Sequence, residues 1–103
     1  MRNAECGIKA AARVVRDFGT NDVFVIAEKA GVKIVYEKWF PVTIGEFDKK
    51  SRTIVVNLNG GERLEKVIAH ELGHFFAVDL KMDKKEEEKF AHAFAEKMLE
   101  NVN

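Results

Sequence analysis

The segment His70-Glu71-Leu72-Gly73-His74 constrains the fold more than any other feature of the sequence. At about 3.6 residues per turn, positions i and i+4 of a helix lie about 40° apart, so two imidazoles with this spacing can reach one metal ion. Glu71 would lie about 100° round from His70, where its carboxylate can reach a water molecule bound to that ion. The spacing therefore predicts a helix and indicates a metal site of the hydrolytic type.

The neighbouring residues favour a metal site over a pair of ordinary surface histidines. Projected on a helix, the apolar side chains form one stripe, which consists of Leu64, Ile68, Leu72, Phe75 and Phe76. His70 and His74 fall together outside this stripe, beside Val67 and Val78. Such a partly polar sector is typical of a cleft wall, so we expect the two histidines to face a cleft.

Two histidines do not complete such a site, because zinc in hydrolases takes three protein ligands and keeps a fourth position for water. The only other cysteine and histidine of the chain are Cys6 and His92. A carboxylate from the C-terminal segment 83–101 is therefore the leading candidate for the third ligand.

This C-terminal segment has the pattern of a second helix. Asp83 and Glu86 have the spacing of a capping box, which marks the helix start. The periodicity that follows extends through Glu100. It is formed by Phe90, Ala91, Phe94, Ala95 and Met98.

The acidic run at the start of this helix offers two candidate ligands, Glu88 and Glu87. For Glu86, a solvated helix N-terminus is the better explanation. Glu88 flanks the apolar stripe and His92 follows one turn later on the same face, so both can face the helix of the two histidines. Glu87 projects into the apolar sector and is the second candidate.

Two of these motifs together resemble a known group of proteases. The HELGH segment followed by Glu88–Ala95 (EKFAHAFA) is similar to the HExxH and ExxAxxFA pattern of the ImmA/IrrE-type metallopeptidases. It resembles still more the minigluzincins, gluzincin-type zinc metallopeptidase domains of about this size. Upstream, Arg52–Leu58 resembles the strand before the family's active-site helix, and Asp22–Val35 resembles its short helix and following strand. The resemblance implies a zincin-like fold.

The resemblance also implies roles for individual residues. It places zinc on His70, His74 and Glu88, with Glu71 as general base and acid. His92 departs from the family pattern, which has Asn or Asp one turn after the third ligand. Outer groups orient metal-binding histidines. His92 is therefore expected either to take that role through a neutral ring nitrogen, to polarise the substrate carbonyl, to compete for the metal, or to be a partly exposed helix histidine.

The N-terminal part of the chain predicts two helices before the sheet. The first covers Asn3–Asp17 and is stopped by Gly19. The second is short, is capped by Thr20 or Asn21, and ends at Gly31.

A small, mostly antiparallel sheet is expected next. Val32–Trp39 alternates like a half-buried strand, and Thr43–Phe47 with Arg52–Leu58 has the pattern of a hairpin. With the active-site helix and the C-terminal helix that carries the third ligand, this predicts an α+β fold in one domain, residues 1–103.

Composition supports one small domain in the cytoplasm. The 103 residues, 47% of them hydrophobic, suffice for one modest core. One cysteine excludes an internal disulfide, and the first residues lack the apolar run of a signal peptide or membrane anchor. The 17 basic and 17 acidic residues balance without a basic cluster, which argues against nucleic-acid binding. Abundant Lys and Glu, no Gln and one Ser are typical of a thermophilic source.

These features together predict a zinc-dependent endopeptidase. Zinc would lower the pKa of its bound water, and Glu71 would take a proton as that water attacks a scissile carbonyl. An extended peptide substrate is expected to pair with an edge strand at Ile44–Phe47, because the nearby Pro41 is typical of a sheet edge. Tyr36 is a candidate hydrogen-bond donor to the tetrahedral intermediate.

Other residues carry smaller expectations. Gly73 weakens its helix by about 1 kcal/mol relative to Ala, which suggests close approach by another element. Trp39–Val42 is expected in the core at a strand end, with a cleft wall or a protein-interaction patch as the alternatives. Cys6 is expected to pack as a small apolar residue, with an inhibitory contact to zinc as the alternative. A terminal segment, Met1–Cys6 or Asn101–Asn103, could also block the site.

Two other classes of function compete with a peptidase. A non-catalytic regulator could keep zinc for binding a protein partner, but it has no physical need for a general base such as Glu71. A structural zinc domain usually has a closed site of four ligands rich in cysteine. Here a closed site would need His92 or Cys6 as the fourth ligand.

Overall fold

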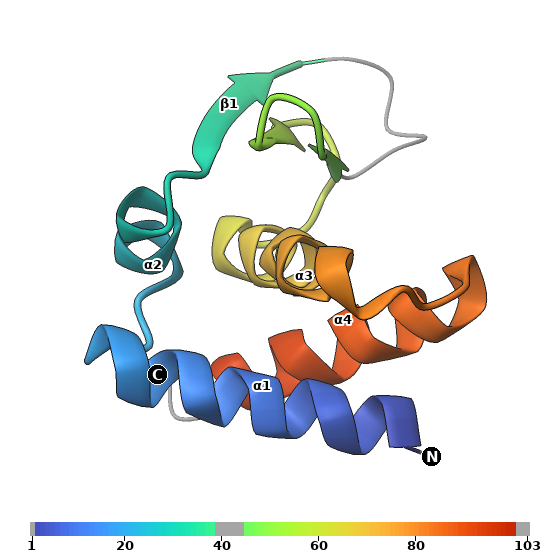
Figure 1. Ribbon diagram of the computed structural model, residues 1–103. Coiled ribbons are helices and arrows are strands. Elements are labelled where there is room, and N and C mark those ends of the chain that lie inside the picture. Colours follow the sequence, from blue (N-terminus) through green and yellow to red (C-terminus); the bar gives the residue numbers. More distant parts are fainter. Residues whose placement is uncertain (1, 39–44, 101–103) are drawn as a thin grey trace.

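The computed structural model describes residues 2–38 and 45–100 (Figure 1). The first half holds α1 (Arg2–Phe18), α2 (Val23–Lys29), β1 (Lys33–Glu37) and β2 (Gly45–Asp48). The second half holds β3 (Thr53–Asn57), α3 (Leu64–Ala77), the 3₁₀ turn η1 (Val78–Leu80) and α4 (Lys84–Met98). The predicted α+β class and order of helices and strands are confirmed for the described residues.

Helix α3 lies in the middle of the fold. The three-stranded sheet covers one of its sides, and α4 packs against another (Figure 1). Helix α1 in turn packs along α4. This position explains why α3 is buried on more than the predicted stripe, since Val67, Ala69 and Ala77 are buried together with Ile68 and Leu72. The histidine-bearing helix is therefore held from both sides.

The sheet has the strand order β1-β3-β2 and is mixed. β2 and β3 form the predicted antiparallel hairpin, with Phe47 opposite Ile54, whereas β1 runs parallel to β3, with Ile34 opposite Ile54. The expectation of a mostly antiparallel sheet is wrong, because β3 inserts between β1 and β2 and pairs once in each direction. β2 is an edge strand, as predicted for Ile44–Phe47, although Ile44 and Pro41 lie outside the described residues.

Side-chain caps fix where α2 and α4 begin. α2 is capped by Asp22, whose carboxylate accepts hydrogen bonds from the backbone N–H groups of Phe24 and Val25 at 2.9 and 3.3 Å. The cap expected at Thr20 or Asn21 is therefore displaced by one residue or two, since a carboxylate is at least as good a cap there.

The capping box at the start of α4 is confirmed. The N–H of Glu86 donates to Asp83 Oδ1 at 2.8 Å, and the N–H of Asp83 donates to Glu86 Oε1 at 3.2 Å. These reciprocal bonds satisfy two donors that the helix itself leaves unpaired.

The core lies between α3, α4 and the inner face of the sheet. The predicted apolar residues of α4 are all buried: Phe90, Ala91, Phe94, Ala95 and Met98. The other side of α3 is covered by three more of the largest fully buried side chains: Ile54 and Val56 of β3 and Ile26 of α2. Trp39–Val42, expected in the core or at the cleft wall, lies outside the described residues.

Gly73 is the point at which α3 and α4 approach most tightly. A Cβ atom at this position would lie 2.7 Å from Cα and 3.0 Å from Cβ of Ala91. Real Cβ atoms do not reach such distances, so only glycine allows this helix spacing. The close approach predicted for Gly73 is confirmed.

We therefore expect the substitution Gly73→Ala to destabilise the protein. Helix propensity alone would stabilise it by up to about 1 kcal/mol. Forcing a methyl group against the α4 backbone costs about 1–3 kcal/mol. Urea unfolding should show a net loss of up to about 2 kcal/mol, and a gain would contradict the close contact.

Candidate metal centre

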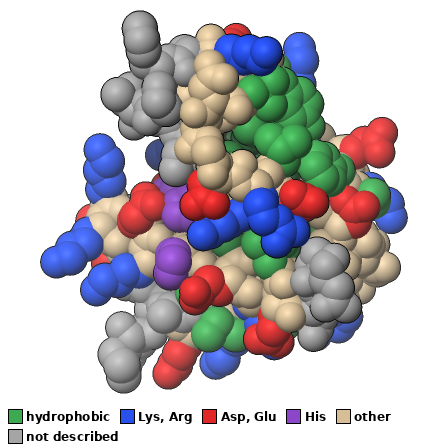
Figure 2. All heavy atoms as spheres, turned by 180° about the vertical axis from the view of Figure 1, so that it is seen from behind, with side chains coloured by type: hydrophobic (Ala, Val, Ile, Leu, Met, Phe, Trp, Pro, Cys, Tyr) green, Lys and Arg blue, Asp and Glu red, His purple; other side chains and the backbone are tan. Residues whose placement is uncertain are grey.

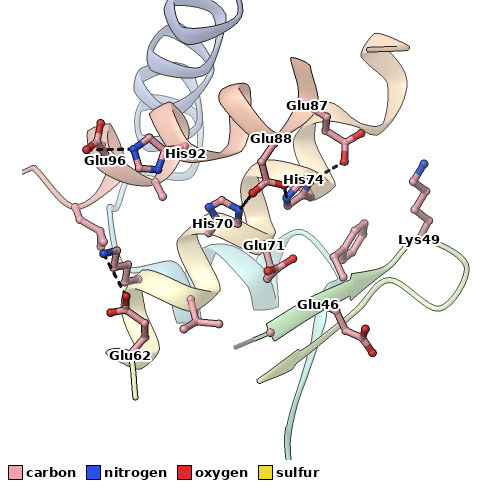
Figure 3. Close-up of a pocket in the computed structure, with 16 residues that line it drawn as sticks. Glu46, Lys49, Glu62, His70, Glu71, His74, Glu87, Glu88, His92 and Glu96 are labelled. Atoms are coloured by element: carbon pink, nitrogen blue, oxygen red, sulfur yellow. Dashed lines mark hydrogen bonds and ion pairs between the residues drawn. The ribbon is translucent and has the colours of Figure 1, made fainter. Parts of the chain in front are cut away.

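α3 and α4 direct a set of histidine and glutamate side chains toward one cleft (Figure 3). His70, Glu71 and His74 come from the middle of α3, and Glu87 and Glu88 come from the N-terminal part of α4. The edge strand β2 forms another wall, and the cleft has a volume of about 660 Å³. Figure 2 shows histidine side chains reaching the surface beside acidic ones.

His70, His74 and Glu88 form a cluster that can hold a metal ion. One ligand atom from each of the three lies within 4.8 Å of the others. Nε2 of His70 donates to Oε1 of Glu88 at 2.7 Å, and Nε2 of His74 lies 3.3 Å from Oε2 of the same carboxylate. The structure thus brings together the three residues expected as ligands.

The spacing of these atoms fits a small divalent cation. With bond lengths of about 2.0–2.1 Å and tetrahedral angles, two ligand atoms of zinc lie about 3.3 Å apart. The His74–Glu88 distance of 3.3 Å matches this value, while the His70–Glu88 distance of 2.7 Å must lengthen by about half an ångström. The Glu88 side chain is 60% exposed and has room for this adjustment.

Glu87 binds the other ring nitrogen of His74. Oε2 of Glu87 accepts a hydrogen bond from Nδ1 of His74 at 2.6 Å. The sequence pattern made Glu87 an alternative ligand, but the structure places it on the far side of the imidazole from Glu88. Consecutive helix positions differ by about 100°, so Glu87 and Glu88 can contact different sides of the His74 imidazole. Their adjacency in the sequence was the feature from which this contact could have been predicted.

Glu71 is a buried carboxyl group on the floor of the cleft. It is 8% exposed and lies beside β2, because a Cβ atom on Gly45 would be 3.7 Å from its Oε2. Burial raises the pKa of Glu71 from 4.5 to about 7, the neighbouring charge of His74 opposes this rise, and Glu88 and Glu46 add to it. The group is therefore able to take up and release a proton near neutral pH.

Burial also favours the neutral form of His70. It lowers the pKa of His70 below the usual 6.5, although the hydrogen bond and charge of Glu88 act in the opposite direction. A neutral imidazole has the lone pair that a metal ion needs.

His92 lines the cleft but stands apart from the ligand cluster. Its side chain is 66% exposed, and its Nε2 lies 3.5 Å from Oε2 of Glu96, one turn further along α4. The structure does not bring it to either ring of the cluster as an orienting partner, because one helical turn moves it about 6 Å beyond Glu88. That position is taken by Glu87 instead.

Two other candidate residues lie away from the site. Tyr36 is 45% exposed on β1, which is separated from β2 by β3, and it is not among the described residues that line the cleft. The structure therefore does not place it as a donor to a reaction intermediate. Cys6 is exposed on α1, so the expectation that it packs as an apolar residue is wrong. Met1 and Asn101–Asn103 lie outside the described residues.

No protein-family model, curated protein or solved structure matches this chain. The assignment of the site therefore depends on its own residues and their geometry. None of the helices in the described part of the chain is both long and apolar enough to span a membrane.

The buried Glu71 predicts a pH-dependent effect of the substitution Glu71→Gln in metal-free protein. Because its pKa is raised, the Glu71 contribution to stability is fully present below about pH 4.5 and is lost as the pH rises through 7. Glutamine does not titrate. The variant should therefore gain up to about 3 kcal/mol relative to wild type between pH 4.5 and pH 8.

Urea unfolding in the presence of a chelator at these two pH values measures this difference. The other titrating groups are shared by the two proteins and largely cancel. An equal stability difference at both pH values would mean that Glu71 is not held in a desolvated site.

Proposed function

We propose that this chain is a zinc peptidase of the gluzincin type, in which His70, His74 and Glu88 hold the metal. The observation that supports this is the convergence of two histidines from α3 and one carboxylate from α4 beside a buried glutamate. Two imidazoles, one carboxylate and an open position are the donor set of hydrolytic zinc enzymes. The resemblance to minigluzincins rests on the same residues.

In the proposed reaction, Glu71 moves the proton. Zinc, when bound, lowers the pKa of a coordinated water and polarises the scissile carbonyl. Glu71 accepts a proton from the attacking water and then donates it to the leaving nitrogen, so that the carboxyl group ends the cycle ionised as it began. Its raised pKa of about 7 suits both transfers.

The edge strand β2 is the proposed site for the peptide backbone. Gly45, Glu46 and Phe47 line the same cleft as Glu71, and β3 pairs with only one side of β2. A strand edge offers backbone donors and acceptors to any extended peptide, with little demand on its sequence. This supports a polypeptide substrate.

The buried Glu71 also favours catalysis over the alternatives. A buried carboxylate costs stability, and a regulator or a structural zinc domain would gain nothing from it. A closed structural site needs a fourth ligand, but the cluster found among the described residues contains three. Both residues considered for that place, Cys6 and His92, are exposed.

The metal assignment predicts one zinc ion per wild-type chain. Glu88→Ala removes a ligand and should weaken zinc binding by more than about 100-fold, which exceeds the usual effect of losing an outer contact. The matched control is Glu96→Ala, which removes a carboxylate two turns along α4 and should leave the affinity unchanged. Chelator competition and metal analysis give both values, and equal losses in the two variants would contradict this ligand set.

The catalytic assignment predicts that zinc-loaded wild type cleaves members of a mixed peptide library and that Glu71→Gln does not. Loss of a general base slows such reactions about 10²–10⁴-fold, while zinc should remain bound. Glu65→Gln is the control, because Glu65 lies on α3 outside the cleft lining. This variant should cleave the peptides at the wild-type rate.

Mass spectrometry of the library detects cleavage and reports the preferred sites. Cleavage that survives in Glu71→Gln would contradict the role of Glu71. Zinc binding without any cleavage by wild type would favour the non-catalytic regulator.

A further inference from the structure

His74 is held by two consecutive glutamates of α4, one on each ring nitrogen. Glu87 Oε2 lies 2.6 Å from Nδ1, and Glu88 Oε2 lies 3.3 Å from Nε2 (Figure 3). Glu88 belongs to the ligand cluster, whereas Glu87 does not. The shorter of the two contacts is therefore made by the residue to which the proposed reaction gives no role.

The chemistry of this contact fixes the proton on the ring. An ionised carboxylate can only accept, so a separation of 2.6 Å requires that Nδ1 of His74 carries a hydrogen. A neutral imidazole protonated on Nδ1 has its lone pair on Nε2. That nitrogen is the one that faces the ligand cluster.

Burial distinguishes the His74–Glu87 pair, which joins α3 to α4, from the His92–Glu96 pair within α4. The side chains of His74 and Glu87 are 17% and 20% exposed, whereas those of His92 and Glu96 are 66% and 71% exposed and lie 3.5 Å apart. Shielding from water strengthens a charge-assisted hydrogen bond. The Glu87 contact is thus a strong and specific one.

We propose that Glu87 is a positioning residue of the metal centre, which holds His74 as the Nδ1–H tautomer with Nε2 directed at the metal. This inference rests on the proposed metal site. Carboxylates in this position orient metal-binding histidines and increase their basicity. Among the described residues, no carboxylate is bonded to Nδ1 of His70, so the effect is confined to His74.

The start of α4 places Glu87 for this role. Its backbone N–H donates to the carbonyl of Asp83 at 2.9 Å, directly after the capping box. The box fixes the first turn, and the next two residues therefore point to opposite sides of the same imidazole. One helix start supplies both a ligand and the group that orients another ligand.

Zinc affinity is the first test, measured by chelator competition. Glu87→Ala should weaken binding about 10–100-fold. Glu87→Gln keeps an acceptor oxygen without the charge, so its affinity should fall between those of the alanine variant and wild type. Glu96→Ala breaks the exposed His–Glu pair and should bind zinc as wild type does.

A nuclear magnetic resonance measurement adds a readout that depends on the hydrogen bond itself. In zinc-loaded wild type, the Nδ1–H proton of His74 should be shifted far downfield and exchange slowly with water. The shift should shrink in Glu87→Gln and the proton should exchange fast in Glu87→Ala, while the His70 ring signals remain in place.

The outcomes separate this inference from the proposed function. If wild type binds no zinc, the metal site itself is wrong. If wild type binds zinc and Glu87→Ala binds it equally tightly, or the His74 proton is unchanged in that variant, the positioning role is wrong and the metal site stands. The glutamine variant serves this comparison even if the alanine variant fails to fold.

Discussion

The site depends on the close contact between α3 and α4 at Gly73 and Ala91. Only a glycine allows the two backbones to approach so closely. Gly73 lies between His70 and His74 along α3, and its contact residue Ala91 lies one turn after Glu88 on α4. A much wider spacing of the helices would move Glu88 out of reach of the two imidazoles. A weak helix residue in the middle of the motif thus allows the helix spacing that brings His70, His74 and Glu88 together.

Much of this arrangement could be predicted from the sequence because it is local. The capping box of Asp83 and Glu86, the apolar face of α4 and the β2–β3 hairpin each depend on residues within a few positions of one another, and all are confirmed. The approach at Gly73 was also predictable, since an unfavourable helix residue needs a compensating contact.

The rest depends on contacts between distant segments. Whether β1 joins the hairpin beside β2 or beside β3 depends on pairing between segments far apart in the sequence, and no residue of β1 indicates it. The contact of Glu87 with His74 and the separation of His92 from the cluster could not be predicted for a similar reason. Helical spacing shows that both lie near Glu88, but only the rotation of α4 against α3 determines which of them reaches His74.

Anomalous diffraction at the zinc edge from zinc-loaded crystals tests most directly whether α3 and α4 together build one metal centre. We expect a single strong peak within bonding distance, about 2.0–2.2 Å, of His70, His74 and Glu88. A peak on Cys6 or beside His92, or no peak at the cluster, would contradict it.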